Sequence, residues 1–176
     1  MEEKKGQIWI ETVIYTLIGL SLIGLVLAIL TPQVKEFKDR SVIEQTIDSL
    51  NLFDSKVDEV LDAPGNKRKV ELTLLKGDFI INSTGNSTIY ELAESNSMYS
   101  EPGVSVQIGR INVTTTALSK KYRVVLEVKY PSYNITFEGK DIDERFSAAK
   151  LPYNFFIFNN GTNTVTGVLQ IDISEG

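Results

Sequence analysis

An uninterrupted apolar segment near the N-terminus constrains this chain more than any other feature. Residues Thr12 to Thr31 form a run of 20 residues without a charged side chain. As an α-helix this run is about 30 Å long, which matches the hydrocarbon core of a bilayer. Glu11 directly precedes it, and a carboxylate at membrane depth is costly unless it has a partner. The sequence therefore predicts a transmembrane helix with an acid at its entrance.

The composition argues against several classes of function. The 176 residues include neither cysteine nor histidine, so disulfides, thiolate chemistry and the usual zinc or triad sites are not expected. The formal net charge is -5, and phosphate binding needs a basic face, so nucleic acid is not an expected partner. With the anchor removed, one domain without a cofactor remains.

A second helix-forming stretch follows the apolar segment. Its apolar residues recur at three- and four-residue steps, and most of its acids lie off that stripe. The stripe is Ile43, Ile47, Leu50, Phe53, Val57, Val60 and Leu61, and the acids are Asp39, Glu44, Asp48, Asp54, Asp58 and Glu59. Pro32 is expected to kink or break the helix near Leu30–Thr31, and Ala63-Pro64-Gly65-Asn66 is expected to end it. We predict a transmembrane helix over 7–31 and an amphipathic stem helix over 32–63.

From Lys67 onward the apolar period changes to two, which predicts β-strands. The candidate strands contain Val70/Leu72/Leu74, Phe79–Ile81, Val104/Val106/Ile108, Ile111/Val113, Tyr122–Tyr130, Tyr133/Ile135/Phe137, Phe155–Phe158 and Leu169/Ile171/Ile173. A slip of phase predicts a bulge or tight turn at Gly109-Arg110. Seven or eight short strands favour a β-sandwich-like head over 64–176, and hence an α+β fold. Residues 141–150 fit a short helix or a loop.

Five Asn-x-Ser/Thr sequons lie beyond the apolar segment, more than the Asn, Ser and Thr content gives by chance. The acceptor residues are Asn82, Asn86, Asn112, Asn134 and Asn160. They are either glycosylation sites of an extracellular domain or part of a Thr/Asn-rich sheet surface. Lysines flank both sides of the apolar segment, so the positive-inside rule does not orient it. The expectation that residues 33–176 lie outside the cell therefore rests on the sequons.

Catalytic and metal-binding motifs are weak. Ser147-Ala-Ala-Lys150 fits the Ser-x-x-Lys pattern of penicillin-binding enzymes, but no Lys-Thr-Gly triplet exists and Ser132-Tyr-Asn134 precedes the serine. Asp141-Ile-Asp143-Glu144 has calcium-like spacing, but Arg145 occupies the next ligand position and no glycine follows. A solvated acidic turn is the better interpretation. We predict neither an enzyme nor a metal site.

The first residues carry a more specific pattern. A basic leader, Lys4-Lys5-Gly6, is followed by Gln7 and by Glu11 at the fifth position after the glycine. This resembles the archaeal members of the type IV pilin superfamily, which have a class III signal peptide. Their leader ends in glycine, a prepilin peptidase cuts there, and the mature chain reads Gln-x-Ser-x-Glu-x-x-x-Leu. Here Trp9 replaces the serine and Tyr15 the leucine. The resemblance covers about residues 1–31 and implies a leader over 1–6, cut between Gly6 and Gln7.

The resemblance implies a filament subunit with a role in adhesion or another surface function. After cleavage, the α-amine of Gln7 would be positive and four residues before Glu11, so Glu11 could pair with its own or a neighbour's amine and set the register. Glu11 could instead simply lie at the membrane interface beside Trp9. Gly24 and Ala28 form a small-xxx-small pair suited to helix packing.

The expected partners are further copies of the chain or other pilins, a prepilin peptidase and the membrane. The chain is expected in the membrane before assembly and in a cell-surface filament afterwards. Two alternatives remain open from the sequence. One is a single-pass anchored extracellular binding module, and the other is a secretion-system pseudopilin that forms no long filament. An ordinary secretory signal peptide fits less well, because the apolar run is long and Thr31-Pro32-Gln33 is a poor cleavage site.

Overall fold

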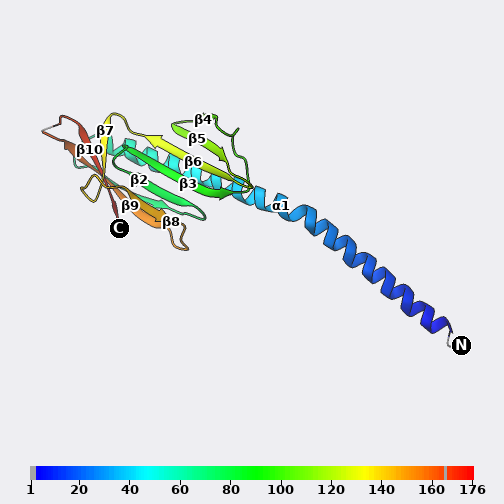
Figure 1. The fold of residues 1–176 in the computed structure, drawn as a ribbon. Helices are drawn as coiled ribbons and strands as arrows, with labels where there is room; N and C mark the ends of the chain where they lie inside the picture. Colours follow the sequence, from blue (N-terminus) through cyan, green and yellow to red (C-terminus); the bar gives the residue numbers. More distant parts are fainter. Residues whose placement is uncertain (1–2, 165) are drawn as a thin grey trace. The chain divides into compact units, whose positions relative to one another are not determined.

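The structure, a computed structural model, describes residues 3–164 and 166–176, with side chains from Trp9 onward (Figure 1). The chain divides into two units, Met1–Lys38 and Asp39–Gly176. Helix α1 (Glu3–Leu61, 59 residues) provides the first unit and the start of the second. The second unit, which we call the head, also contains two β-sheets. The predicted α+β fold with a β-sandwich-like head is confirmed.

Helix α1 has no break at Pro32, where the sequence predicts a kink or break. The proline lies inside a helix that is assigned continuously from Glu3 to Leu61. Proline removes one backbone hydrogen bond, to the carbonyl four residues earlier. The turns on either side retain their own bonds, so the helix continues.

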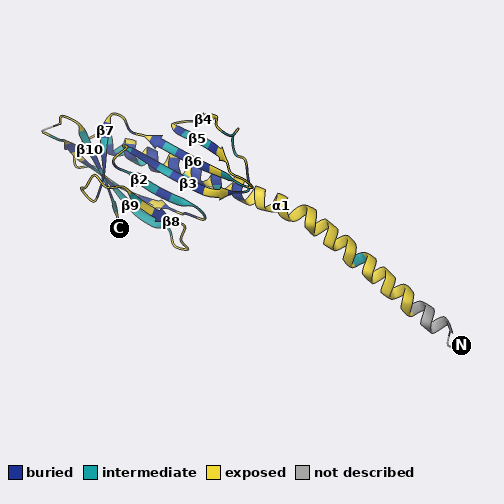
Figure 2. Cartoon of the chain, viewed as in Figure 1, coloured by how far each residue is buried: buried dark blue, intermediate teal, exposed yellow. Residues whose placement is uncertain are grey.

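The predicted apolar stripe of the stem is confirmed, because its residues form one side of the core of the head. Ile43, Leu50, Phe53 and Val57 are at most 1% exposed, and Figure 2 shows buried positions alternating with exposed ones along this part of α1. As predicted, most of the acids lie off the stripe; the exceptions are Asp39 and Asp54, which are buried.

The two sheets differ in size and direction. The four-stranded sheet has the order β1 (Lys67–Leu72), β9 (Tyr153–Thr162), β10 (Leu169–Glu175), β7 (Tyr133–Phe137), and only its β10–β7 pair is parallel. The six-stranded sheet is antiparallel, in the order β4 (Ser105–Ile108), β5 (Ile111–Ala117), β6 (Tyr122–Lys129), β3 (Ser87–Ser95), β2 (Asp78–Asn82), β8 (Glu144–Ser147).

Aromatic side chains join α1 to both sheets. The Phe53 ring lies 5.4 Å from that of Phe79 on β2 and 6.1 Å from that of Phe155 on β9, measured between centroids. The Phe79 and Phe155 rings are 5.7 Å apart, and Phe146 on β8 lies 4.9 Å from Phe155. Such pairs bury large apolar areas and add favourable edge-to-face contacts. The core of the head therefore contains the stem helix and the inner faces of both sheets.

The strand predictions are confirmed for most of the head, with two omissions. The structure has ten strands in its described residues instead of the predicted seven or eight. Strands β3 and β8 were not predicted, and residues 141–150 contain β8 instead of a helix or a plain loop. The predicted tight turn at Gly109-Arg110 is confirmed, since Ile108 pairs with Ile111 across it and Gly109 has a φ of 60°.

The head has two ends, which we name after the stem residues that lie there. At the Asp39 end, Lys76 and Asn96 contact Asp39, and the register pairs Ser95 with Tyr122 and Leu72 with Tyr153. This end therefore carries the loops 73–77, 96–104, 118–121 and 148–152. At the Leu61 end, Asn159 donates to the Val60 carbonyl. Loops 62–66, 83–86, 130–132 and 138–143 lie there, together with residues 163–164 and 166–168 between β9 and β10.

Candidate functional site

The apolar half of α1 is the most extensive exposed apolar surface in the described chain. Every described residue from Trp9 to Lys38 is exposed except Gly19, with Trp9 74% and Leu25 61% exposed. Soluble monomers rarely expose contiguous apolar patches of this kind. This helix is long and apolar enough to cross a membrane, which is compatible with membrane anchoring. We call Trp9–Thr31 the exposed segment.

Three hydroxyl groups of the exposed segment, those of Thr16, Ser21 and Thr31, donate to backbone carbonyls within the helix. The Thr16 hydroxyl donates to the Thr12 carbonyl at 2.8 Å, Ser21 donates to Leu17 at 2.7 Å, and Thr31 donates to Leu27 at 2.6 Å. Local bonds of this kind remove the cost of carrying a hydroxyl into lipid or into an apolar interface. None of these three residues needs an external partner.

Glu11 differs from these residues. No hydrogen bond or ion pair joins its carboxylate to any side chain that the structure describes, and the residue is exposed. The backbone of Gly6 and Gln7 is helical in α1, while their side chains lie outside the described set, so the predicted cleavage site stays a prediction. A carboxylate in an otherwise uncharged segment requires a cation from elsewhere or access to water.

Gly24 and Ala28 lie one helical turn apart and therefore share a face of α1. A Cβ placed on Gly24 would meet nothing within 4 Å, and the same holds for Gly19. The glycines are therefore not required by packing within this chain. Their small size is of use only if another helix approaches this face closely.

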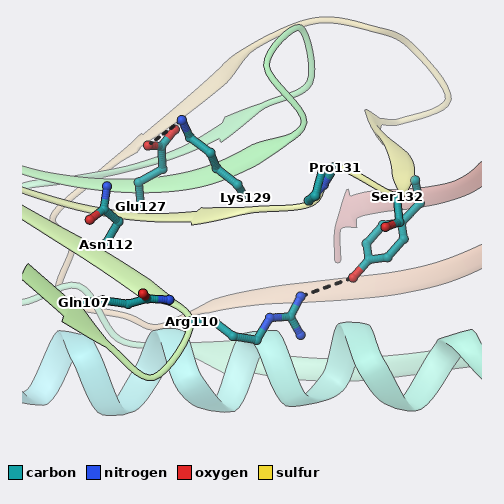
Figure 3. A pocket seen from close by; sticks show the side chains of 8 residues that line it. Gln107, Arg110, Asn112, Glu127, Lys129, Pro131 and Ser132 are labelled. Carbon is teal, nitrogen blue, oxygen red and sulfur yellow. Dashed lines mark hydrogen bonds and ion pairs between the residues drawn. The ribbon is translucent and has the colours of Figure 1, made fainter.

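On the head, the β4–β5 turn holds Arg110 against the stem (Figure 3). One guanidinium nitrogen lies 2.8 and 2.9 Å from the two Asp58 carboxylate oxygens and 3.3 Å from the Asp54 carboxylate. Another donates to the Tyr133 hydroxyl at 3.3 Å, and the group lies 5.8 Å from the centre of the Tyr130 ring. Arg110 thus joins α1, the β4–β5 hairpin and the start of β7. We call its contacts with Asp54, Asp58 and Tyr133 the Arg110 latch.

Burial controls the electrostatics around Arg110. Desolvation raises the pKa of Asp54 above its ordinary value and outweighs the opposing charge of Arg110. One carboxylate oxygen of Asp54 is buried without a hydrogen-bond partner among the described residues. For Arg110, desolvation acts to lower the pKa, but the hydrogen bonds to Asp58 and Tyr133 outweigh it. The pKa therefore lies above its ordinary value. The guanidinium is therefore a permanent cation, as a structural latch requires.

A shallow depression of about 600 Å³ lies beside this latch. It is lined by Gln107, Arg110, Asn112, Glu127, Lys129, Pro131, Ser132 and Tyr133 (Figure 3). Its only charged groups are already paired, Arg110 with Asp58 and Lys129 with Glu127 at 3.5 Å. Asn112, a sequon residue, forms part of the wall, so a glycan there would cover the depression. The lining offers polar contacts to a ligand and no activated nucleophile.

The other motifs from the sequence serve local structure. The Ser147 carbonyl accepts from the Tyr153 hydroxyl at 2.8 Å, and no described hydrogen bond joins the Ser147 hydroxyl to Lys150. Asp141 accepts a hydrogen bond from the Asn134 side-chain amide, and Asp143 accepts one from the Thr84 backbone amide. Both acids therefore stabilise turns. Within residues 3–164 and 166–176, no group of three or more acids is placed to hold a metal ion. The absence of enzymatic activity stays a prediction.

The sequons differ in how far their acceptor and hydroxyl residues are exposed. Asn160 and its partner Thr162 are both exposed, and Asn82 and Asn112 are half-buried with accessible hydroxyl residues. The hydroxyl residues of the Asn86 and Asn134 sequons, Thr88 and Thr136, are 0% and 2% exposed. As predicted, Asn112 and Asn134 lie on the outward faces of strands, between buried neighbours.

Sequence reasoning did not identify the buried network around Asp39. The Asp39 carboxylate accepts from the Lys76 ammonium at 2.6 Å, from the Asn96 backbone amide at 2.7 Å and from the Asn96 side chain at 2.6 Å. A signal was present, because Asp39 lies four residues before Ile43 and Asp54 lies four residues after Leu50. Both acids are therefore in phase with the apolar stripe.

Comparison with known proteins identifies no relative. No family model, curated protein or solved structure matches this chain.

Proposed function

We propose that this chain is a structural subunit of a pilin-type surface filament, cut between Gly6 and Gln7 and assembled through α1. The observation that carries the proposal is Glu11, which has no partner among the described side chains and lies at the entrance of an almost entirely exposed apolar helix. Three hydroxyl residues of the same segment are satisfied within the helix, whereas Glu11, the only charged residue of that segment, pairs with no described side chain. A freed α-amine on Gln7 is a suitable cation.

The small residues and apolar faces of the exposed segment support the second half of the proposal. A simple anchor needs only length and hydrophobicity, and small residues add nothing to either. Gly24 and Ala28 instead reduce the distance at which a second helix can pack. A bundle of copies would cover the apolar faces, and Glu11 would set their axial register as single buried polar groups do in coiled coils.

The mature N-terminus tests the cleavage half of the proposal. Intact-mass spectrometry of the protein from its native membrane or filament fraction is expected to give a chain that starts at Gln7. A Gly6→Val variant is expected to retain residues 1–6 and to remain in the membrane. A native chain that begins at Met1, or one cut within or after the apolar segment, contradicts the proposal and favours a single-pass module or a secreted protein.

A Glu11→Ala variant tests the assembly half. It is expected to insert into membranes normally and to yield few or no filaments, because the unpaired amine then has no partner. Ser21→Ala is the matched control, since the Ser21 hydroxyl bonds only to the Leu17 carbonyl, and it is expected to assemble normally. Filament yield, measured by shearing and electron microscopy, is compared between the two variants. Unchanged yield for Glu11→Ala would leave Glu11 as an interface residue only.

A further inference from the structure

We infer that the Asp39 end of the head contacts the lipid surface of the membrane that holds α1. The apolar residues of the contact are Leu75, Leu118 and Leu151, with Lys120 and Lys150 beside them. This inference rests on the membrane anchor of the proposed function and uses neither the cleavage nor the filament.

Three loops of the Asp39 end each expose a leucine. Leu75, Leu118 and Leu151 are 60%, 45% and 79% exposed. Their loops are neighbours in the head. The Ala149 amide donates to the Leu74 carbonyl, which joins two of them. The third is joined through Glu94, whose carbonyl accepts from Lys76 and whose carboxylate pairs with Lys121 at 3.3 Å. Leucines at the tips of neighbouring loops suit shallow burial among lipid headgroups.

The charges of the two ends differ in sign. The loops of the Asp39 end carry Lys76, Lys120, Lys121 and Lys150 with Glu101. Among the described residues Lys120 and Lys150 have no ion-pair partner. The loops of the Leu61 end carry Asp62, Glu138, Asp141 and Asp143 with Lys140. Basic loops are attracted to anionic headgroups, and acidic loops are repelled by them.

The positions of the sequons also distinguish the two ends of the head. Asn82, Asn86, Asn134 and Asn160 belong to the Leu61 end: Asn86 accepts from the Ile135 amide, Asn134 contacts Asp141, and Asn160 adjoins Asn159, which contacts the end of α1. No sequon lies in the loops of the Asp39 end. Bulky hydrophilic glycans suit an end that faces water. The exposed Ile142 of the Leu61 end lies between two acids, unlike the leucines of the Asp39 end.

The chain length keeps the Asp39 end close to the bilayer. Thr31, the last residue of the predicted transmembrane helix, precedes Asp39 by eight residues. Even a fully extended link of this length spans at most about 29 Å, whatever the orientation of the head. An apolar and basic surface held so near a bilayer needs little further free energy to bind it, because the anchor has already lost the freedom to diffuse away.

The chain contains no cysteine, so single cysteines can carry a polarity-sensitive fluorophore without background. We suggest Ser119→Cys at the Asp39 end and Ser132→Cys at the Leu61 end, both at exposed positions. The full-length chain is reconstituted into vesicles with anionic lipids and a headgroup-spin-labelled lipid as quencher. The label at 119 is expected to shift to the blue and to be quenched, whereas the label at 132 stays unquenched.

A triple variant separates contact from mere proximity. Leu75→Asp, Leu118→Asp and Leu151→Asp, introduced together into the Ser119→Cys chain, are expected to abolish the blue shift and most of the quenching. Because all three leucines are exposed, the fold is expected to persist, and circular dichroism checks this. High salt or zwitterionic vesicles are expected to weaken the effect, since the lysines then contribute less.

Several outcomes overturn the inference. They are an unquenched label at 119, equal quenching at 119 and 132, or quenching that the triple variant leaves unchanged. Energy transfer between copies labelled at 119, without quenching, would assign the leucines to a second copy instead of lipid. Intact mass of the protein from its native membrane keeps the two proposals apart. Absence of quenching, together with a native chain that starts at Gln7, overturns only the lipid contact. Quenching, together with a native chain that is uncut, overturns only the pilin proposal.

Discussion

Asp39 is a buried acid whose hydrogen bonds determine its titration. Burial alone would raise its pKa, but bonds from Lys76 and Asn96 lower the pKa below the ordinary value of 3.8. A carboxyl group with a lowered pKa in the folded state stabilises the fold above its unfolded pKa. That contribution is lost as the pH falls through the lower, folded value.

Asp39→Asn is therefore expected to lower the free energy of unfolding by about 1–3 kcal/mol at pH 7. The difference from the wild type should stay constant above about pH 5 and shrink below pH 4, where the wild-type carboxylate takes up its proton. Denaturant unfolding in detergent between pH 3 and 7 measures it. Asp48→Asn, at an exposed position of the same helix, is the control and should change stability by less than about 0.5 kcal/mol. A loss for Asp39→Asn that is independent of pH would contradict this account.

Sequon occupancy is a second prediction at the residue scale. If glycans are added to the folded head, Asn160 is expected to be modified and Asn134 is not. The Thr136 hydroxyl is buried and donates to Asp172 at 2.7 Å, so a transferase cannot reach it. Glycopeptide mass spectrometry of the native protein measures occupancy. Full modification of Asn134 would mean that glycans are attached before the head folds.

At the scale of helices and strands, the sequence predicted those elements whose apolar residues recur with a regular period. The stem was predictable because six of its stripe residues face one core, and β6 because every second residue from Tyr122 to Val128 is apolar. Strand β3 was not, since its buried positions include Ser87 and Thr88, whose polarity hides the alternation. Strand β8 buries only Phe146. The Arg110 latch depends on contacts between residues 52 positions apart, which spacing along the chain does not reveal.

The Arg110 latch gives a prediction for the β4–β5 hairpin. Arg110→Ala leaves Asp54 buried without its cation, so it is expected to cost about 1–3 kcal/mol of unfolding free energy and to speed amide exchange in β4. Arg145→Ala is the matched control, because its partners Asp78 and Glu91 lie on the solvent side of the sheet and are partly exposed; it should cost less than about 1 kcal/mol. Hydrogen exchange with mass spectrometry compares the two. Equal effects would show that Arg110 is an ordinary surface arginine.

For the whole molecule, the single tryptophan is a native reporter of assembly. Trp9 is the only tryptophan and is 74% exposed in the isolated chain. In filaments free of lipid and detergent, helix packing should shield Trp9 from acrylamide and give blue-shifted emission. Quenching constants of intact and dissociated filaments measure this. Ready quenching in intact filaments would indicate assembly through the heads.

The parallel β7–β10 pair has a consequence for the order in which the head is made. Strand β10 lies between β9 and β7, so β7 has no partner in its sheet until the last strand in sequence has been synthesised. Contacts so distant along the chain form late and slowly. Stem residues that pack on this sheet, such as Phe53 against Phe155, lack part of their cover until the sheet is complete. If the head is exported, as the proposed function requires, it would cross the membrane as an open chain, and a chaperone on the far side that shields the stem stripe would raise its yield.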